Sequence, residues 1–424
     1  MKIIKVIGYQ VLDSRGKPTV AAAISLEDGS THTARVPSGA STGKHEAVEL
    51  RDGDNSFSNK YYSGKSVHLA VNNINSKIAP NLIGKTIDLI KVDQQLVELD
   101  PTESHQDLGA NATLAISLAA AIANAHTNKV SLARFFQPFG KLLIPMPMVN
   151  ILSGGAHAKR ALDIQDILIV PNGANSFTEA ISWIVAVREM AAKLGSEAGK
   201  ITHLVADEGG LGIPFESTEH ACEFVLGAIT ETGLKVGRDI SLALDIAATQ
   251  FFDGSNYKLT TNGENFSSAE FVEYSLNLVR NFPIISIEDP FAEDDWNAWS
   301  YFSKLAPKNL QILGDDLLTT NSGRLDRAIS EKSANAILIK ANQNGLVTST
   351  QSVLKQAQSA GFNTVVSARS GETEDSWLAD LATGWRAGQI KVGSTHGAER
   401  NSKWNRLLEL EATEVCEFKN PFLD

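Results

Sequence analysis

The chain has 424 residues, of which 43% are hydrophobic and 21% are charged, so it is long enough for two soluble globular domains. The net charge of −11 and the pI near 5.4 argue against a nucleic-acid partner, because such proteins carry a basic face. The two cysteines, Cys222 and Cys416, lack the spacing of a disulfide framework or a thiolate metal site and favour a cytoplasmic protein. The most apolar later segment, residues 114–125, is too short to span a membrane.

The first 60 residues predict a small antiparallel meander, because alternating apolar runs are separated by Gly and Asp turns. These runs are residues 3–12, 19–28 and 31–37. Apolar residues three and four apart then predict helices that cover the sheet, in residues 66–84, 86–100 and 111–126. Glycines and prolines near residues 130–140 mark a boundary, so we expect an α+β domain over residues 1–132 and a second domain over residues 133–424.

Beyond this boundary, short and nearly continuous apolar runs alternate with amphipathic segments, which is typical of a parallel α/β sheet buried on both faces. One amphipathic segment opens with a capping box from Ser267 to Glu270. The apolar runs are residues 242–248, 284–290, 311–317, 336–343, 363–369 and 388–393. An open doubly wound sheet would show the same alternation. Polar residues at so many strand ends would meet at one site only in a closed barrel, which we therefore expect.

Three acidic residues end consecutive apolar runs, namely Asp245, Glu288 and Asp315. At the mouth of a barrel, like charges raise one another's pKa unless a cation compensates them. Oxygen ligands without Cys or His favour Mg²⁺ first and Mn²⁺ next. Each acid taken singly could instead cap the helix that follows it, but that explanation is poor for three acids in register.

Two lysines, Lys340 and Lys391, end later runs and would face the same metal. A lysine beside a divalent ion has a lowered pKa and could remove a proton, and a second lysine could stay charged and bind a substrate carboxylate. Glu208 could protonate a leaving hydroxyl, although the sequence DEGG is more often a turn. Arg369 and Ser370 suit a phosphate or a second carboxylate.

Two glycine-bearing loops complete the candidate site. Residues 37–47 are rich in Gly and Ser and could form a lid that carries Ser41 to the metal. His157 lies on the second loop, where a lone histidine is more often solvated than functional.

Eight motifs resemble those of the enolase family in order and spacing over nearly the whole chain. They are DSRGKPTV, VPSGASTGKHEAVELRD, DEGG, SIEDPF, GDDL, LIKANQNG, RSGETEDSWLADLATG and GQIKVGS. The resemblance implies a capping domain followed by an eight-stranded TIM-like barrel with an irregular first part. It also implies a cytoplasmic, Mg²⁺-dependent hydro-lyase of glycolysis, a phosphopyruvate hydratase, that acts on a small anionic substrate and forms a homodimer or a larger homo-oligomer.

The resemblance also implies roles for individual residues. Asp245, Glu288 and Asp315 match the ligands of the tighter Mg²⁺, and Ser41 matches a lid residue that helps to bind a second ion. Lys340 matches the base and Glu208 the acid. Lys391 matches the lysine that binds the substrate carboxylate, Arg369 and Ser370 match phosphate contacts, and His157 matches a histidine that closes over the substrate. Gln165 and Asp166 are expected beside the substrate as well.

This chain departs from the family pattern on the acid side of the site and near the lid. Ala368 stands where the family has an active-site histidine, and Asp166 stands where it has a glutamate. Lys17 replaces an asparagine and Gly397 replaces an arginine. Two cations, Lys159 and Arg160, follow the loop of His157.

Three functions therefore stay open. The first is dehydration of 2-phosphoglycerate to phosphoenolpyruvate, with Glu208 acting alone or with a water or His396 in the space beside Ala368. The second is the same metal-enediolate chemistry on a different phospho- or phosphono-hydroxy acid, with Lys159 and Arg160 meeting an additional anionic group. The third is a non-catalytic scaffold that keeps the fold.

Overall fold

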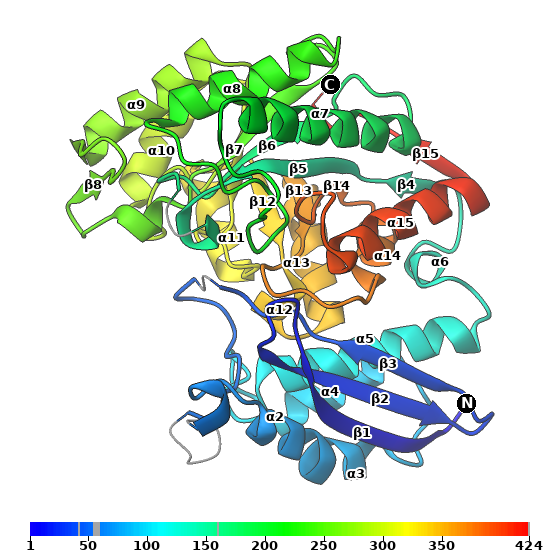
Figure 1. Cartoon of the computed structure of the whole chain (residues 1–424). Coiled ribbons are helices and arrows are strands. Elements are labelled where there is room, and N and C mark those ends of the chain that lie inside the picture. The colour runs from blue at the N-terminus through cyan, green and yellow to red at the C-terminus, as the bar shows by residue number, and fades with distance from the viewer. Residues whose placement is uncertain (41–42, 54–59, 159–160, 423–424) are drawn as a thin grey trace.

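The computed structural model describes residues 1–40, 43–53, 60–158 and 161–422. The chain forms an N-terminal sheet with helices and a larger barrel surrounded by helices (Figure 1). The N-terminal sheet is antiparallel, and its strands follow one another in the order β1 (Ile3–Leu12), β2 (Pro18–Leu26) and β3 (Thr31–Arg35). The predicted three-stranded meander is therefore confirmed.

The helices of the N-terminal part pack against this sheet. Residues 68–82 form one nearly continuous helix, in which a wider π-type turn at Ile74–Ile78 joins α2 to α3. The long helix α5 is rich in alanine and packs on β2 and β3, because small side chains allow the helix to approach the sheet closely. The helices are α2 (His68–Asn73), α3 (Ala79–Leu82), α4 (Leu89–Leu99), α5 (Ala110–Thr127) and α6 (Leu132–Phe136).

Eight strands form a closed barrel in the order β10-β11-β12-β13-β14-β5-β6-β7, which confirms the expected barrel and excludes an open sheet. Neighbouring strands are parallel except that β6 runs antiparallel to both β5 and β7. This reversal is the irregular first part of the barrel. The strands are β5 (Met146–Ser153), β6 (Asp166–Val170), β7 (Ser241–Asp245), β10 (Ile284–Glu288), β11 (Gln311–Gly314), β12 (Ala336–Ile339), β13 (Asn363–Ser367) and β14 (Gly388–Lys391).

Helices surround the barrel, and α9 opens with the predicted capping box of Ser267 and Glu270. The barrel helices are α7 (Phe177–Glu197), α8 (Thr218–Glu231), α9 (Ser268–Asn281), α10 (Trp296–Leu305), α11 (Ser322–Glu331), α12 (Ala341–Asn344), α13 (Val347–Ser359), α14 (Trp377–Gly384) and α15 (Ala398–Thr413). Short strands complete the fold: β4 (Leu142–Ile144) pairs with β15 (Cys416–Phe418), and β8 (Asn256–Lys258) pairs with β9 (Asn265–Ser267).

The apolar filling of the barrel positions the charged side chains. Ala243, Leu313 and Leu338 belong to one buried cluster together with residues from other barrel strands. Successive side chains of a strand point to opposite faces, so the residue two positions further on points to the same side. In these three strands that residue is Asp245, Asp315 and Lys340. The same alternation that packs the barrel interior therefore directs charged groups into its mouth, the end at which the parallel strands finish.

The N-terminal part contacts the barrel at this mouth. The backbone groups of Ser38 and Gly371 exchange two hydrogen bonds, of 2.8 and 2.9 Å. Asp375 accepts a hydrogen bond from the backbone nitrogen of Arg35 at 2.7 Å and also forms an ion pair with its side chain. A Cβ at position 371 would lie 2.2 Å from an oxygen of Asp13, so this close approach requires glycine.

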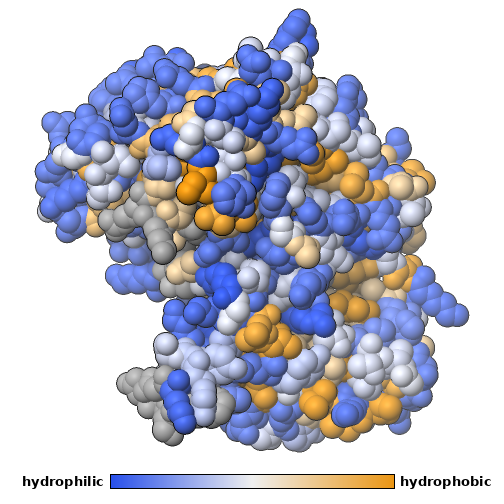
Figure 2. All heavy atoms as spheres, viewed as in Figure 1, coloured by the Kyte–Doolittle hydropathy of each residue, from blue (hydrophilic) through white to orange (hydrophobic). Residues whose placement is uncertain are grey.

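The surface is mostly hydrophilic on the face shown in Figure 2, and apolar residues form separate patches. Within the described ranges, the helices are too short or too polar to cross a lipid bilayer. Both cysteines, Cys222 and Cys416, carry free thiols.

Candidate active site

The acids predicted as metal ligands meet at the mouth of the barrel. Glu288 and Asp245 are paired in the register of β10 and β7, and Asp315 follows the adjacent strand β11. The Nζ atom of Lys391 donates hydrogen bonds to Asp245 Oδ2 and Glu288 Oε2, each at 2.7 Å. All four side chains are almost completely buried, and the structure brings them together at the mouth of the barrel.

Burial and the neighbouring negative charges of Asp245 and Asp315 raise the pKa of Glu288 well above its ordinary value. Burial acts to lower the pKa of Lys391, but the carboxylates of Asp245 and Glu288 outweigh it and raise that pKa well above its usual range. The ammonium group of Lys391 therefore sits where two carboxylates need a cation.

Lys340 follows β12 and forms an ion pair with Asp315 Oδ2. Asp315 Oδ1 also accepts a hydrogen bond of 2.9 Å from Gln343 Nε2. Burial acts to lower the pKa of Lys340, but the charge of Asp315 outweighs it, so the pKa is raised. The sequence predicts a lowered pKa for Lys340 beside a divalent ion. Among the protein's own groups, the pairing of its amine with Asp315 raises the pKa instead.

The donor set fits a hard divalent cation. Two carboxylate oxygens converge on a single amine, and Asp315 adds a third carboxylate at the same mouth. Carboxylate oxygens without Cys or His are the ligands that Mg²⁺ prefers. Members of the enolase family generally use this ion.

Among the described residues, the acids whose ligand oxygens all lie within 4.8 Å of one another are Asp289, Asp315 and Asp316, a group that shares only Asp315 with the predicted trio. Asp289, however, accepts hydrogen bonds from the backbone nitrogens of Asp315 and Asp316, at 2.9 and 2.7 Å. Its carboxylate therefore fixes the turn after β11. Burial and the charge of Asp315 raise the pKa of Asp316 to about 7.

Arg369 binds a carboxylate of the capping domain. Its guanidinium donates to both oxygens of Glu46, at 3.0 and 3.3 Å, and to Asn342 at 3.1 Å. The hydroxyl of Ser370 accepts hydrogen bonds from the backbone nitrogen of Ala40 at 2.7 Å and from Arg15 at 3.2 Å. The predicted anion-binding pair therefore lies where the lid segment meets the barrel.

These groups surround a narrow catalytic cavity of about 20 Å³, which has room for about one water molecule. A larger ligand requires the surrounding side chains to separate. The lining residues are Ala40, Gln165, Glu208, Asp315, Lys340, Ser367, Ala368, Arg369, Ser370, Lys391 and Val392.

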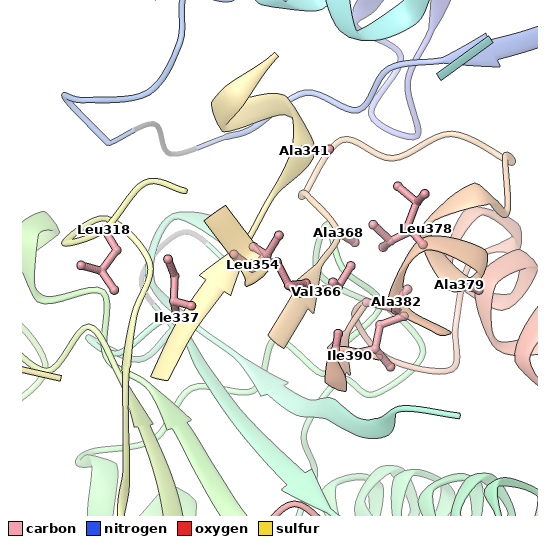
Figure 3. Close-up of a cluster of buried hydrophobic side chains, with 14 of the residues drawn as sticks. Leu318, Ile337, Ala341, Leu354, Val366, Ala368, Leu378, Ala379, Ala382 and Ile390 are labelled. Atoms are coloured by element: carbon pink, nitrogen blue, oxygen red, sulfur yellow. The ribbon is translucent and has the colours of Figure 1, made fainter. Parts of the chain in front are cut away.

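The acid side of the cavity contains the main departures from the family pattern. Ala368 is buried, and its methyl group belongs to the apolar cluster that includes Val366 and Leu378 (Figure 3). Asp166 is fully buried and accepts hydrogen bonds from Ser153 at 2.6 Å and Asn150 at 3.0 Å. Glu208 is buried as well, and its charge and that of Asp166 act on Lys391.

Gln165 is hydrogen-bonded to Asp245 Oδ2 at 3.0 Å, so it orients a predicted metal ligand. His396 is exposed, and it is not among the residues that line the cavity. The structure therefore does not support His396 as a substitute for the missing imidazole, because its side chain faces solvent.

Ser41, Lys159 and Arg160 lie outside the described residues, and the backbone at His157 forms a short helical turn, Gly155–Ala158.

Three residues that contact the site were not predicted from the sequence: Glu46, Asp289 and Gln343. Each lies inside a motif that was quoted for another residue: Glu46 is in the same lid segment as Ser41, Asp289 follows Glu288, and Gln343 lies three residues after Lys340. An acid or amide next to a candidate ligand was the signal that could have identified them.

Removing the amine of Lys391 should leave buried carboxylates without their counter-ion. We expect Lys391→Met to lower the free energy of unfolding by about 3–5 kcal/mol, as for other broken buried ion pairs. Urea denaturation followed by circular dichroism would measure this change. The matched control is Lys304→Met on the exposed side of α10, which should change the free energy by less than about 0.5 kcal/mol. Equal stability of the two variants would contradict the expected loss.

An eight-stranded barrel with an N-terminal domain over an acidic, lysine-containing mouth defines the class of α/β-barrel proteins whose candidate site lies at the carboxyl ends of the barrel strands. Two family descriptions match the chain: "Enolase, N-terminal domain" over residues 3–136 and "Enolase, C-terminal TIM barrel domain" over residues 141–419. The chain belongs to the enolase family.

Proposed function

We propose that this protein is a Mg²⁺-dependent hydro-lyase that converts 2-phosphoglycerate to phosphoenolpyruvate. The observation that carries the proposal is one cluster at the mouth of the barrel, in which Lys340 and Lys391 are paired with the buried acids Asp245, Glu288 and Asp315. Such a cluster supplies a cation site and two amines around the position of a bound carboxylate. A scaffold without catalytic activity would have no need for this concentration of buried charge, which costs stability.

Asp245, Glu288 and Asp315 would hold the ion. When bound, Mg²⁺ would compete with the lysines for these carboxylates and stabilise the negative charge of an enediolate. Lys340, released from Asp315, would accept the proton from the carbon next to the substrate carboxylate. Lys391 would bind that carboxylate with its ammonium group.

The leaving group would depart on the other side of the cavity. Glu208 would donate a proton to the hydroxyl, which leaves as water while the carbon–carbon double bond forms. Arg369 and Ser370 would hold the phosphate. Arg369 is paired with Glu46 of the lid segment. The phosphate would therefore replace the Glu46 carboxylate as the partner of Arg369, and the lid segment would have to move.

Two measurements on the purified protein test this proposal. Loss of the α-proton signal of 2-phosphoglycerate in heavy water with Mg²⁺ reports proton abstraction, and phosphoenolpyruvate absorbance reports the whole reaction. Exchange without phosphoenolpyruvate would mean that the protein forms the enediolate but acts on another substrate. Absence of both under saturating substrate and Mg²⁺ would exclude the proposal.

A histidine at position 368 should accelerate the elimination of water. We expect Ala368→His to raise the rate of phosphoenolpyruvate formation by about 10²-fold, the lower end for a positioned proton-transfer group. Steady-state absorbance assays measure this change. Ala368→Leu fills a similar volume without a proton donor and should not accelerate the reaction. If both variants slow the reaction equally, the space beside Ala368 accommodates part of a bulkier substrate instead.

A further inference from the structure

A second cavity, of about 480 Å³, lies next to the catalytic cavity on the side of the N-terminal sheet. Its volume is within the range of small-molecule sites. Its charged lining consists of four cations and two carboxylates: Arg15, Lys17, Arg51, Lys65, Glu49 and Asp207. The lining is therefore basic in a protein whose net charge is −11.

The four cations differ in what they contact. Arg15 forms an ion pair with buried Asp13 at 3.0 Å, and Arg51 forms one with Glu49 at 2.5 Å. Lys17 and Lys65 are exposed, and among the described residues neither amine has an ion-pair or hydrogen-bond partner. These two amines are therefore available to an anion.

The backbone holds the two lysines near the same arginine. Arg51 Nη1 donates to the carbonyl of Pro18 at 2.5 Å and to the carbonyl of Lys65 at 2.6 Å. The backbone nitrogen of Lys17 donates to Asp13 Oδ1 at 2.9 Å, which fixes the turn between β1 and β2. The two segments are thus joined before any ligand binds, so only the lysine side chains need to be ordered.

The second cavity and the catalytic cavity share a wall. Ala40 lines both, and Arg15 of the second cavity donates to Ser370 of the catalytic cavity at 3.2 Å. Asp207 lines the second cavity, while its neighbour Glu208 lines the catalytic one. The two cavities are therefore adjacent at Ala40.

We propose that the second cavity binds an additional oxyanion, a carboxylate, phosphate or phosphonate, of a substrate whose reacting part occupies the catalytic cavity. This inference rests on the proposed proton-abstraction chemistry and extends its substrates to hydroxy acids that carry a third anionic group. Two ammonium groups and the net positive lining supply charge-assisted hydrogen bonds for such a group. Ala368 lines the catalytic cavity together with Ala40, where the surrounding side chains would have to separate to admit the reacting part of such a molecule.

Titration with inorganic phosphate, followed by calorimetry, tests the second cavity by itself. We expect the double variant Lys17→Gln/Lys65→Gln to weaken one phosphate site by at least about tenfold, and Lys17→Arg/Lys65→Arg to keep it. The matched control Lys304→Gln/Lys308→Gln removes two exposed lysines elsewhere and should bind phosphate as the wild type does. Equal phosphate affinity of the wild type and both glutamine double variants would overturn the proposal. A phosphate bound at Arg369 would stay in every variant.

Citrate, which has three carboxylates, tests whether one molecule reaches both cavities. We expect Lys17→Gln/Lys65→Gln and Ala368→Leu each to weaken citrate binding by about tenfold, whereas phosphate should respond to the lysine substitutions alone. If only the lysine substitutions weakened citrate binding, the claim that a single substrate spans the two cavities would be overturned. Both titrations measure binding and do not depend on catalysis. If heavy-water exchange showed no proton abstraction, the proposed function would be excluded, but the anion site could still be demonstrated.

Discussion

Replacing Lys340 with methionine is expected to reduce α-proton exchange of 2-phosphoglycerate in heavy water by at least about 10²–10⁴-fold, the usual effect of a positioned proton-transfer group. Methionine keeps an apolar side chain of similar length but cannot accept a proton. The rate of signal loss in proton NMR, at saturating substrate and Mg²⁺, measures the effect. Lys340 is the amine paired with Asp315, so its removal affects the acid cluster as well as the base.

Lys304→Met is the control for this experiment, because Lys304 is an exposed lysine on α10. It should exchange the proton at the wild-type rate. Circular dichroism of Lys340→Met establishes whether the variant is folded. A folded variant that exchanges within about threefold of the wild type would show that another group is the base.

Asp315→Asn is expected to weaken divalent-cation binding by more than about 100-fold, because even residues that only support a ligand typically change metal affinity by about 10–100-fold. An amide keeps the size of the side chain and removes its charge. Electron paramagnetic resonance with Mn²⁺ measures free and bound ion directly, without any substrate. The substitution also removes the partner that raises the pKa of Lys340.

The control for metal binding is Asp107→Asn, an exposed acid of the N-terminal part. It should bind Mn²⁺ with wild-type affinity. If Asp315→Asn also retained the wild-type affinity, the ion would bind elsewhere, because Asp315 belongs both to the predicted trio and to the group with Asp289 and Asp316.

The barrel and its charged mouth could be predicted from the sequence because they follow from local periodicity. The apolar runs have the lengths of strands, and the charged residues stand at their ends. In the structure, Asp245, Glu288 and Lys391 are the last residues of β7, β10 and β14. The side-chain alternation of period two then carries these groups to one side of the sheet.

The contacts that close the site could not be predicted in this way. Glu46 and Arg369 are 323 residues apart, and nothing in the local sequence of either indicates that they form an ion pair. The raised pKa of Lys340 has the same origin, since it depends on which carboxylate the amine reaches in the folded chain. Likewise, Asp289 has the sequence context of a metal ligand but is used by backbone nitrogens.

The reversed direction of β6 changes which end of this strand faces the mouth of the barrel. A parallel strand presents its final residue at the mouth, but β6 presents its first residue, Asp166, beside Asp245. The connection between β5 and β6 therefore starts and ends at the mouth instead of at the far end of the barrel, and Gln165 at its end lines the catalytic cavity. Insertions or substitutions there can reshape substrate preference while the strand framework stays unaltered, which gives this family a place to acquire new specificity at little cost to folding.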